Sequence, residues 1–409
     1  MATERVPALP LGHEAEYGPG SMKRPDTVVI GGGIAGLAAA WRLAQRGRKV
    51  LLLEQETQTG SHSSARNAAI WLPFDDVPST PVLAKRSAAL LDELLGPGRW
   101  RTQHEALVVS EGTGEDLEAP LRVLRAAGLR AQLVEAPFIG RRAPALRGGR
   151  GGVAVWVEDA AILDIHAMVD GLSRAARRCG VEVRTAQRVT KIRRRENAQE
   201  QVEVCGVELE SGGVVESSQV LIAGGAWAAD LGRSCAAGLP IQAFRRHLVQ
   251  LDVAAAAASA IVWRVGDEVY YRPESEGLLA SPCEELPFEP CLPPADDACL
   301  GLLARKLEGL APALIDAKVR RHWACLRTFA ADRELVLGVD PRIRGLHWFA
   351  GLGGRGMTIG VAAGDLCAAL LAESSGLAGS VLDADQRAMA GSMDPGRLLV
   401  RSSHALSTR

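Results

Sequence analysis

The chain has 409 residues, with 47 lysines and arginines against 48 aspartates and glutamates, and a formal net charge of −1. This balance gives no electrostatic reason to expect nucleic acid or an anionic membrane as the main partner, and the length allows two domains with buried cores. The eight cysteines have no paired or zinc-like spacing, so we expect a reduced, cytoplasmic protein with no metal site and no disulfide framework. We also expect no transmembrane segment, because the longest alanine-rich run is too short to span a bilayer.

Residues 1–25 are rich in proline, glycine and charge and lack the basic-then-apolar order of a signal peptide. We expect a loose extension there. Met22 could be an alternative start, which leaves open whether the residues before it are native.

The segment that follows has the order strand, glycine-rich turn, helix, strand. Short apolar runs at residues 28–30 and 50–53 predict two buried strands, and helical spacing over residues 34–46 predicts the helix between them. The second strand ends in Glu54, whose carboxylate can accept hydrogen bonds from both hydroxyls of a ribose.

Three glycines in GxGxxG spacing form the turn. Gly31 permits the tight turn, Gly33 allows the backbone to approach a pyrophosphate, and Gly36 allows close packing of helix on strand. The helix begins at Ile34 and Ala35, whose free N–H groups face the phosphates. The pattern predicts a dinucleotide site, with a glycine turn in an ordinary α/β domain as the less favoured alternative.

The next stretch, GSHSSARNAA at residues 60–69, favours FAD over NAD. Its small side chains would let the backbone lie along an extended dinucleotide, where an NAD enzyme would continue into another helix and strand. His62 and Arg66 could reach a ring system, or they could cap loop carbonyls. The residues of this region that we expect to contact the cofactor are Gln55, Ser61, His62, Ser63, Arg66, Asn67 and Ala68.

Periodicity predicts further elements along the chain. The expected helices are 80–95, 118–127, 165–178 and 300–311, and the expected strands are 153–157, 181–184, a meander over 189–220 with a turn at 211–213, and four runs within 241–282. Residues 140–152 predict a basic, solvated loop.

Two later glycine-containing turns suggest that the nucleotide site draws on distant parts of the chain. One contains Gly224, Gly225 and Trp227 after a buried strand, and we expect cofactor contacts from these three residues and from Val189, where the strand meander begins. The other precedes a long helix, whose N-terminus suits an anion or a polarised ring edge. There we expect cofactor contacts from Gly353, Gly354, Arg355, Gly356, Met357 and Thr358.

From about Asp26 to Leu398 the chain resembles the FAD-dependent amine and D-amino-acid oxidoreductases, which include D-amino-acid oxidase, glycine oxidase and sarcosine oxidase. The motifs VVIGGGIAG, SHSSARNAA, VLIAGGAWAADL, ACLRTFAADRELVLG and HWFAGLGGRGMTIG carry the resemblance, and D-arginine dehydrogenase-like proteins look nearest. The resemblance implies bound FAD and oxidation of an amino acid (D-amino acid, glycine or N-methyl type) to the imine by hydride transfer to flavin N5, followed by hydrolysis to the oxo acid.

We therefore expect an α/β (α+β) fold with a Rossmann-like FAD-binding domain of the glutathione-reductase type and a second, mainly antiparallel-sheet substrate domain. The sequence assigns residues 26–105, 153–240 and 326–409 to the discontinuous FAD-binding domain. Residues 106–152 and 241–325 are assigned to the substrate domain.

The resemblance also implies roles for single residues. His62 would face the flavin edge or the substrate cavity, Arg327 would grip a substrate carboxylate, and Tyr270 would be the active-site tyrosine, with Tyr271 on the opposite sheet face. Gly354 would lie under the flavin and border the substrate.

Arg245 and Arg246 alternate in the same way, so one of the two would line the substrate cavity. Cys325 stands where the sarcosine-oxidase branch bonds covalently to the flavin. Attachment of FAD through Cys325 is therefore an open alternative, and we do not count this cysteine as catalytic. Leu279 stands where those oxidases carry a lysine, which favours a dehydrogenase over an oxidase.

Two other functions stay open. One is an FAD-dependent 2-hydroxy-acid dehydrogenase with His62, His247 or His322 as the base. The other is a flavoprotein subunit of a hetero-oligomeric amine dehydrogenase, for which the proline-rich residues 282–297 are either a docking loop or a surface excursion. The expected partner is a small-molecule substrate, and the electron acceptor is not identified.

Overall fold

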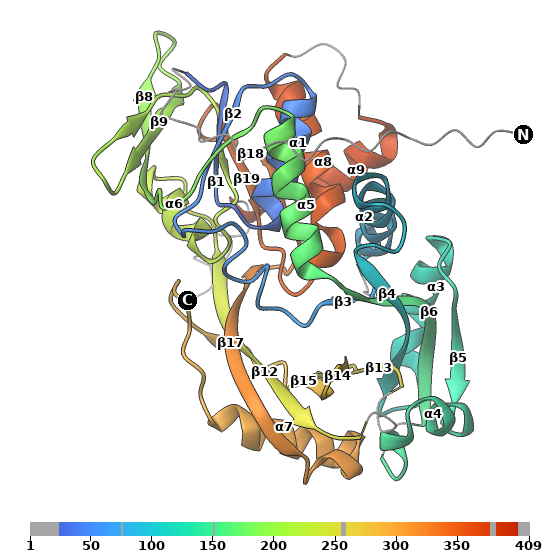
Figure 1. The fold of residues 1–409 in the computed structure, drawn as a ribbon. Helices are drawn as coiled ribbons and strands as arrows, with labels where there is room; N and C mark the ends of the chain where they lie inside the picture. The colour runs from blue at the N-terminus through green and yellow to red at the C-terminus, as the bar shows by residue number, and fades with distance from the viewer. Residues whose placement is uncertain (1–23, 75–76, 150–151, 255–258, 377–381, 400–409) are drawn as a thin grey trace, which may run out of the picture.

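The computed structural model describes residues 24–74, 77–149, 152–254, 259–376 and 382–399 (Figure 1). Residues 1–23 of the expected extension lie outside them.

A six-stranded sheet in the order β18-β19-β11-β1-β2-β7 forms the centre of one domain. Five of its strands are parallel, and the edge strand β18 is antiparallel to β19. The strands are β1 (Thr27–Ile30), β2 (Val50–Leu53), β7 (Glu182–Arg184), β11 (Val220–Ile222), β18 (Val336–Val339) and β19 (Leu346–Ala350).

Alternate side chains of these short apolar strands enter different cores. Val29 and Leu52 belong to the core under the helices, whereas Val28 and Leu53 belong to the core on the other face. The helices of the first face are α1 (Ile34–Gln45), α5 (Ile165–Arg178) and α8 (Gly356–Ser374), seen beside the sheet strands, to their right, in Figure 1. The other face carries β8 (Val189–Glu196), β9 (Val202–Leu209), β10 (Val214–Val215) and α6 (Ala228–Ser234).

The second domain contains a larger sheet, whose main path is β16-β12-β15-β14-β13-β4-β6-β3, with β17 beside β12 and β5 beside β6. All of its pairs are antiparallel except β13 with β4. Its strands are β3 (Ile70–Trp71), β4 (Arg101–Ser110), β5 (Ala131–Glu135), β6 (Val153–Leu163), β12 (Ile241–Asp252), β13 (Ile261–Arg264), β14 (Val269–Glu274), β15 (Gly277–Ser281), β16 (Leu286–Pro287) and β17 (Lys318–Ala330).

The large sheet extends beyond the bounds expected from the sequence. β4 starts before residue 106, β17 ends after residue 325, and β6, assigned to the FAD-binding domain, pairs with β4 and β5. The acidic pair Glu158–Asp159 interrupts the apolar alternation of β6 and forms a bulge there, in which these two residues stand opposite the single residue Glu105 of β4. The remaining helices are α2 (Ser79–Leu95), α3 (Glu115–Ala126), α4 (Ala136–Arg142), α7 (Ala298–Leu310) and α9 (Ala384–Met393), of which α4 and α9 were not expected.

α8 is the one helix of the described chain that is long and apolar enough to cross a membrane, with a mean hydropathy of 1.4. In the fold 78% of that apolar window is buried, as expected for a core helix. A Cβ added at Gly364 would lie 2.6 Å from the Cβ of Ala38, so glycine permits the close contact between α8 and α1.

His347 on β19 is a buried imidazole whose protonation we expect to destabilise the fold. Its Nε2 lies 2.5 Å from Oε1 of Gln219, and burial lowers its pKa from 6.5 to about 3. Between these values the unfolded chain binds the proton and the folded chain does not, so stability falls as the pH falls, by about 1.4 kcal/mol per pH unit.

His347→Gln should remove this part of the pH dependence. Urea unfolding at pH 7 and pH 5 would measure it: the stability advantage of the wild type over the variant should shrink by about 2 kcal/mol at pH 5. An advantage that is equal at both pH values would contradict the assignment.

Candidate active site

A cavity of about 440 Å³ lies where segments from distant parts of the chain meet. Its walls come from the glycine-rich turn after β1, the tip of β2, and both domains. Besides these, the lining segments are 60–67, 187–190, 223–231, 291–293, 325–328 and 351–357.

The glycine-rich turn has a shape that only glycine allows. Gly31 has φ +108°, and a Cβ there would lie 2.5 Å from the carbonyl oxygen of Ala223, directly after the neighbouring strand β11. A Cβ at Gly36 would lie 1.9 Å from the carbonyl oxygen of Gly31. The turn therefore brings the N-terminus of α1 close to the cavity, as an extended pyrophosphate requires.

Glu54, at the end of β2, is held in place by backbone donors. Oε2 accepts the N–H of Gly32 at 2.6 Å, and Oε1 accepts the N–H of Glu56 at 2.9 Å. Burial raises the pKa of this carboxyl, while the two backbone hydrogen bonds oppose the rise. The carboxylate lines the cavity, where it can accept hydrogen bonds from a ribose.

Residues 60–69 run alongside β17. Ser63 Oγ donates to the carbonyl oxygen of Leu326 at 2.6 Å, and Arg66 Nε donates to that of Ala324 at 3.3 Å. The Asn67 side chain bonds the backbone of its own segment, donating to two carbonyls and accepting the N–H of Ala69 at 2.7 Å. The polar residues of the stretch thus hold its backbone against the cavity.

The contacts of His62 lie toward the Glu54 end of the cavity. Its Nε2 is 2.8 Å from Oε1 of Glu56 and 3.4 Å from Nε2 of Gln55, and its ring centroid is 4.7 Å from that of Trp227. Neither Arg327 nor Tyr270 is among these partners. A catalytic role of His62 therefore stays a prediction, and its position fits cofactor binding.

Arg327 on β17 places a buried guanidinium in the cavity wall. It is 7% exposed, and its NH1 donates to the carbonyl oxygen of Leu326 at 3.3 Å. No carboxylate of the described chain lies within ion-pair distance of it. A buried guanidinium needs an anion to compensate its charge, and the described chain supplies no carboxylate for it. Arg327 is therefore suited to bind an anionic ligand.

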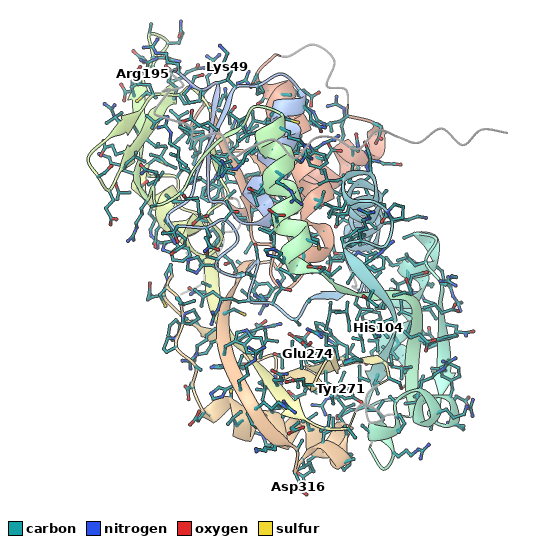
Figure 2. The ribbon with its side chains drawn as sticks, in the orientation of Figure 1. Lys49, His104, Arg195, Tyr271, Glu274 and Asp316 are labelled. Carbon is teal, nitrogen blue, oxygen red and sulfur yellow. The ribbon has the colours of Figure 1, made fainter. Side chains whose placement is uncertain are left out.

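Strand alternation separates the two tyrosines and the two arginines in question. Tyr271 belongs to the core that packs on α7, whereas Tyr270 lies in the opposite cluster and stacks on Trp263 with ring centroids 4.7 Å apart. Tyr271 is labelled with the side chains of this sheet in Figure 2. Burial raises the pKa of Tyr270 well above its usual range.

Arg246 pairs in register with Cys325, so both share a sheet face with Arg327. Its NH2 lies 2.6 Å from Oε1 of Glu285, whereas Arg245 on the other face lies 2.7 Å from Oδ2 of Asp296. Of the two arginines, Arg246 is the one that shares the sheet face of Cys325 and Arg327, although it is not itself among the residues that line the cavity.

Twenty of the residues expected to form the site line the cavity: Gly31, Gly33, Ile34, Ala35, Glu54, Gln55, Ser61, His62, Ser63, Arg66, Asn67, Val189, Gly224, Gly225, Trp227, Arg327, Gly353, Gly354, Gly356 and Met357. The others lie outside its lining: Gly36, Ala68, Arg245, Arg246, Tyr270, Arg355 and Thr358. Gly36 supports the turn from behind, and Arg355 NH1 donates to Thr80 Oγ1 at 3.1 Å.

Several lining residues were not expected, among them Ser64, Gln187, Arg188, Thr190, Asp230, Cys291, Leu292, Pro293 and Thr328. Ser64 accepts the N–H of Ile34 at 3.0 Å, and its place within SHSSARNAA could have indicated a site role. Residues 291–293, within the proline-rich segment 282–297, carry no local signal for a nucleotide.

The sequence pattern of the family described as "FAD dependent oxidoreductase" (DAO) matches residues 26–370. The chain belongs to this family. This confirms the predicted FAD-dependent oxidoreductase and its cofactor, FAD. The glycine turn, the N-terminus of α1 and Glu54 are the parts of this flavoenzyme that fit the dinucleotide.

Two curated relatives illustrate the likeness. The flavoenzyme is 26% identical over 351 residues to 4-methylaminobutanoate oxidase (formaldehyde-forming) of Paenarthrobacter nicotinovorans, covering 81% of this chain and 42% of that protein. It is 26% identical over 334 residues to glycine oxidase of Pseudomonas putida, covering 78% of this chain and 87% of that protein. The chain thus spans less than half the length of the first relative.

Solved structures confirm the predicted fold class. The flavoenzyme aligns with L-proline dehydrogenase from P. horikoshii at a TM-score of 0.76 and 19% identity, covering 86% of this chain and 94% of that chain. It aligns with glycine oxidase from Geobacillus kaustophilus at a TM-score of 0.73 and 21% identity, covering 86% of this chain and 95% of that chain.

Cys325 lines the cavity but is 2% exposed, and its Sγ lies 3.6 Å from the carbonyl oxygen of Arg246. Because the thiol is turned toward the neighbouring strand, we expect FAD to be bound without a covalent bond. Precipitation in acid should then release all the yellow colour into the supernatant. Colour retained in the wild-type pellet and lost in Cys325→Ala would establish the covalent bond instead.

Proposed function

We propose that this flavoenzyme oxidises an amino acid, of the D-amino acid, glycine or N-methyl amino acid type, to an imine that hydrolyses to the oxo acid. The observation that carries the proposal is the buried guanidinium of Arg327, which has no carboxylate partner among the described residues. The α-carboxylate of a substrate would supply the missing anion through a two-pronged, charge-assisted hydrogen bond. When bound, FAD supplies the acceptor for the hydride that leaves the substrate.

The residues of the chain would act by positioning. Arg327 would hold the carboxylate, and so orient the carbon that carries the amine. Tyr270 and Trp263 supply a stacked aromatic surface on the same side of the sheet. Arg246 is already compensated by Glu285 and Glu268, so Arg327 is the better anion site. The names of the relatives, glycine oxidase and 4-methylaminobutanoate oxidase, are consistent with amine oxidation.

The three histidines considered as bases for a 2-hydroxy acid have carboxylate partners away from Arg327. Nε2 of His62 lies 2.8 Å from Glu56, Nε2 of His322 lies 3.0 Å from Asp297, and His247 contacts Glu284. This arrangement favours an amine, which needs no strong base once it is uncharged, over an alcohol.

Anaerobic mixing tests the proposal. D-amino acids, glycine and sarcosine should include a compound that bleaches the flavin absorbance and yields ammonia or methylamine with an oxo acid. If all of these leave the flavin oxidised while 2-hydroxy acids bleach it, the amine proposal is wrong and the hydroxy-acid alternative is right.

The electron acceptor and the location belong to the same proposal. Leu279 is 2% exposed beside Ala68 and Tyr270, so no lysine ammonium stands at this place, which favours a dehydrogenase over an oxidase. The eight cysteines are all free thiols, which favours the reducing cytoplasm. A subunit role in a hetero-oligomer stays open, and activity of the isolated chain would exclude it.

A further inference from the structure

Residues 282–297 follow β15, run beside β17 to the start of α7, and form part of the wall of the FAD cavity (Figure 1). Cys291, Leu292 and Pro293 line the cavity from this segment. Leu292 is nevertheless 57% exposed, so the segment is thin enough to touch the cavity on one side and solvent on the other. We call residues 282–297 the strap.

One imidazole fastens both ends of the strap. His247 lies on β12 and is 2% exposed. The backbone N–H of Asp296, at the end of the strap, donates to its Nε2 at 3.0 Å. Since Nε2 accepts this bond, the proton of the neutral ring is on Nδ1, which contacts Oε1 of Glu284 at the start of the strap.

Further hydrogen bonds hold the strap to β12. Glu284 Oε1 also accepts the backbone N–H of His247 at 2.8 Å, and the N–H of Phe288 donates to the carbonyl oxygen of Ala243 at 3.0 Å. Phe288 packs against the small cluster that contains Ala243 and Leu326. The three cavity-lining residues lie between these two sets of anchors.

The arginines that alternate on β12 add one ion pair to each end. NH2 of Arg246 lies 2.6 Å from Oε1 of Glu285, and NH2 of Arg245 lies 2.7 Å from Oδ2 of Asp296. Both guanidinium groups are largely buried, but the side chain of Asp296 is 43% exposed and that of Glu285 is 26% exposed, so solvent screens the Arg246 pair less than the Arg245 pair. The strap is therefore fixed to the sheet at its ends, while its middle covers the cavity.

We propose that the strap retains FAD in the cavity and that His247 is the positioning residue that keeps it closed. The inference requires that the chain binds FAD, which family membership establishes, and it is independent of the substrate. A bound dinucleotide leaves only after the covering segment moves, so the anchors of the strap contribute to the barrier to FAD release.

Exchanging His247 for phenylalanine removes both imidazole hydrogen bonds and keeps a planar ring. The holoenzyme of this variant should release FAD about tenfold faster on dilution, as expected for the net loss of one or more hydrogen bonds. The fluorescence of released FAD measures the rate. Backbone amides of the strap should also exchange faster with deuterated solvent.

His104→Phe is the matched control, because His104 lies in the same sheet on β4, opposite Ala160 and away from the strap (Figure 2). It should leave FAD release unchanged. If His247→Phe speeds amide exchange in the strap but not FAD release, the strap is no barrier and the proposal is overturned. If strap exchange stays at the wild-type rate, His247 does not fasten it, and the proposal is equally overturned.

If His247→Phe does not fold, Glu284→Ala serves as the second variant. It is the milder change, because it frees only the first end of the strap. It should give a smaller acceleration in the same direction. Alkylation of the holoenzyme gives an independent readout: Cys291 in the strap should react several-fold faster in either variant, while the exposed Cys179 reacts as in the wild type. Equal labelling of Cys291 in wild type and variant would overturn the proposal.

Discussion

Arg327→Ala should lower kcat/KM for the amino-acid substrate by about a hundredfold or more. Truncating one partner of a buried, hydrogen-bonded charge pair costs about 2–5 kcal/mol, and each 1.4 kcal/mol is a factor of about ten. Part of this decrease in kcat/KM should be a rise in KM, because the guanidinium binds the carboxylate in the ground state as well as at the transition state. Steady-state kinetics over a range of substrate concentrations measures both parameters.

Two controls separate binding from folding. Arg327→Lys keeps the charge but loses the planar fork, so it should fall between the wild type and Arg327→Ala. Both variants should keep FAD bound, since Arg327 is proposed to hold the substrate. Normal FAD content with unchanged kcat and KM in Arg327→Ala would show that this arginine is not the carboxylate site.

Gly36→Ala should produce a protein that is strongly destabilised and poor in FAD. The added Cβ would lie 1.9 Å from the carbonyl oxygen of Gly31 and 3.1 Å from its carbonyl carbon, so the helix or the turn must move. Overpacking of this kind costs about 1–3 kcal/mol, and displacement of the turn also removes the pyrophosphate cradle. The FAD-to-protein ratio and urea unfolding measure the two effects.

Gly301→Ala makes the same substitution in α7, where a Cβ would meet no atom within 4 Å. There alanine should leave FAD content unchanged and stabilise the helix by up to about 1 kcal/mol. A Gly36→Ala protein that binds FAD as tightly as Gly301→Ala would contradict the close approach of α1 to the turn.

The fingerprint at Gly31, Gly36 and Glu54 could be predicted from the sequence because its residues follow one another in a single strand–turn–helix–strand unit, although the close approach of Gly31 to Ala223 joins distant parts of the chain. The same holds for the separation of Tyr270 from Tyr271, since alternation along a strand follows from backbone geometry alone. Which arginine of the pair on β12 shares a sheet face with Arg327 depends on β17 and β12 meeting, and that contact joins residues far apart in the chain.

The strap was beyond sequence prediction for the same reason. Cys291–Pro293 line the cavity between Glu284 and Asp296, which both meet His247, and none of these residues has a pattern typical of nucleotide binding. The contact of His62 with Glu56 likewise depends on the turn that brings residues 60–67 back toward β2. The motif predicted that His62 lies at the cofactor cavity, but it did not predict the contact of His62 with Glu56.

The central claim, that a buried guanidinium binds the carboxylate of an amine substrate, is tested most directly with pairs of compounds that differ by that carboxylate. Sarcosine against dimethylamine, and D-alanine against ethylamine, should be mixed anaerobically with the enzyme while the flavin absorbance is followed. We expect at least one amino acid of the panel to bleach the flavin at a concentration where its decarboxylated counterpart leaves it oxidised. Equal bleaching by the amine that lacks the carboxylate would contradict the account.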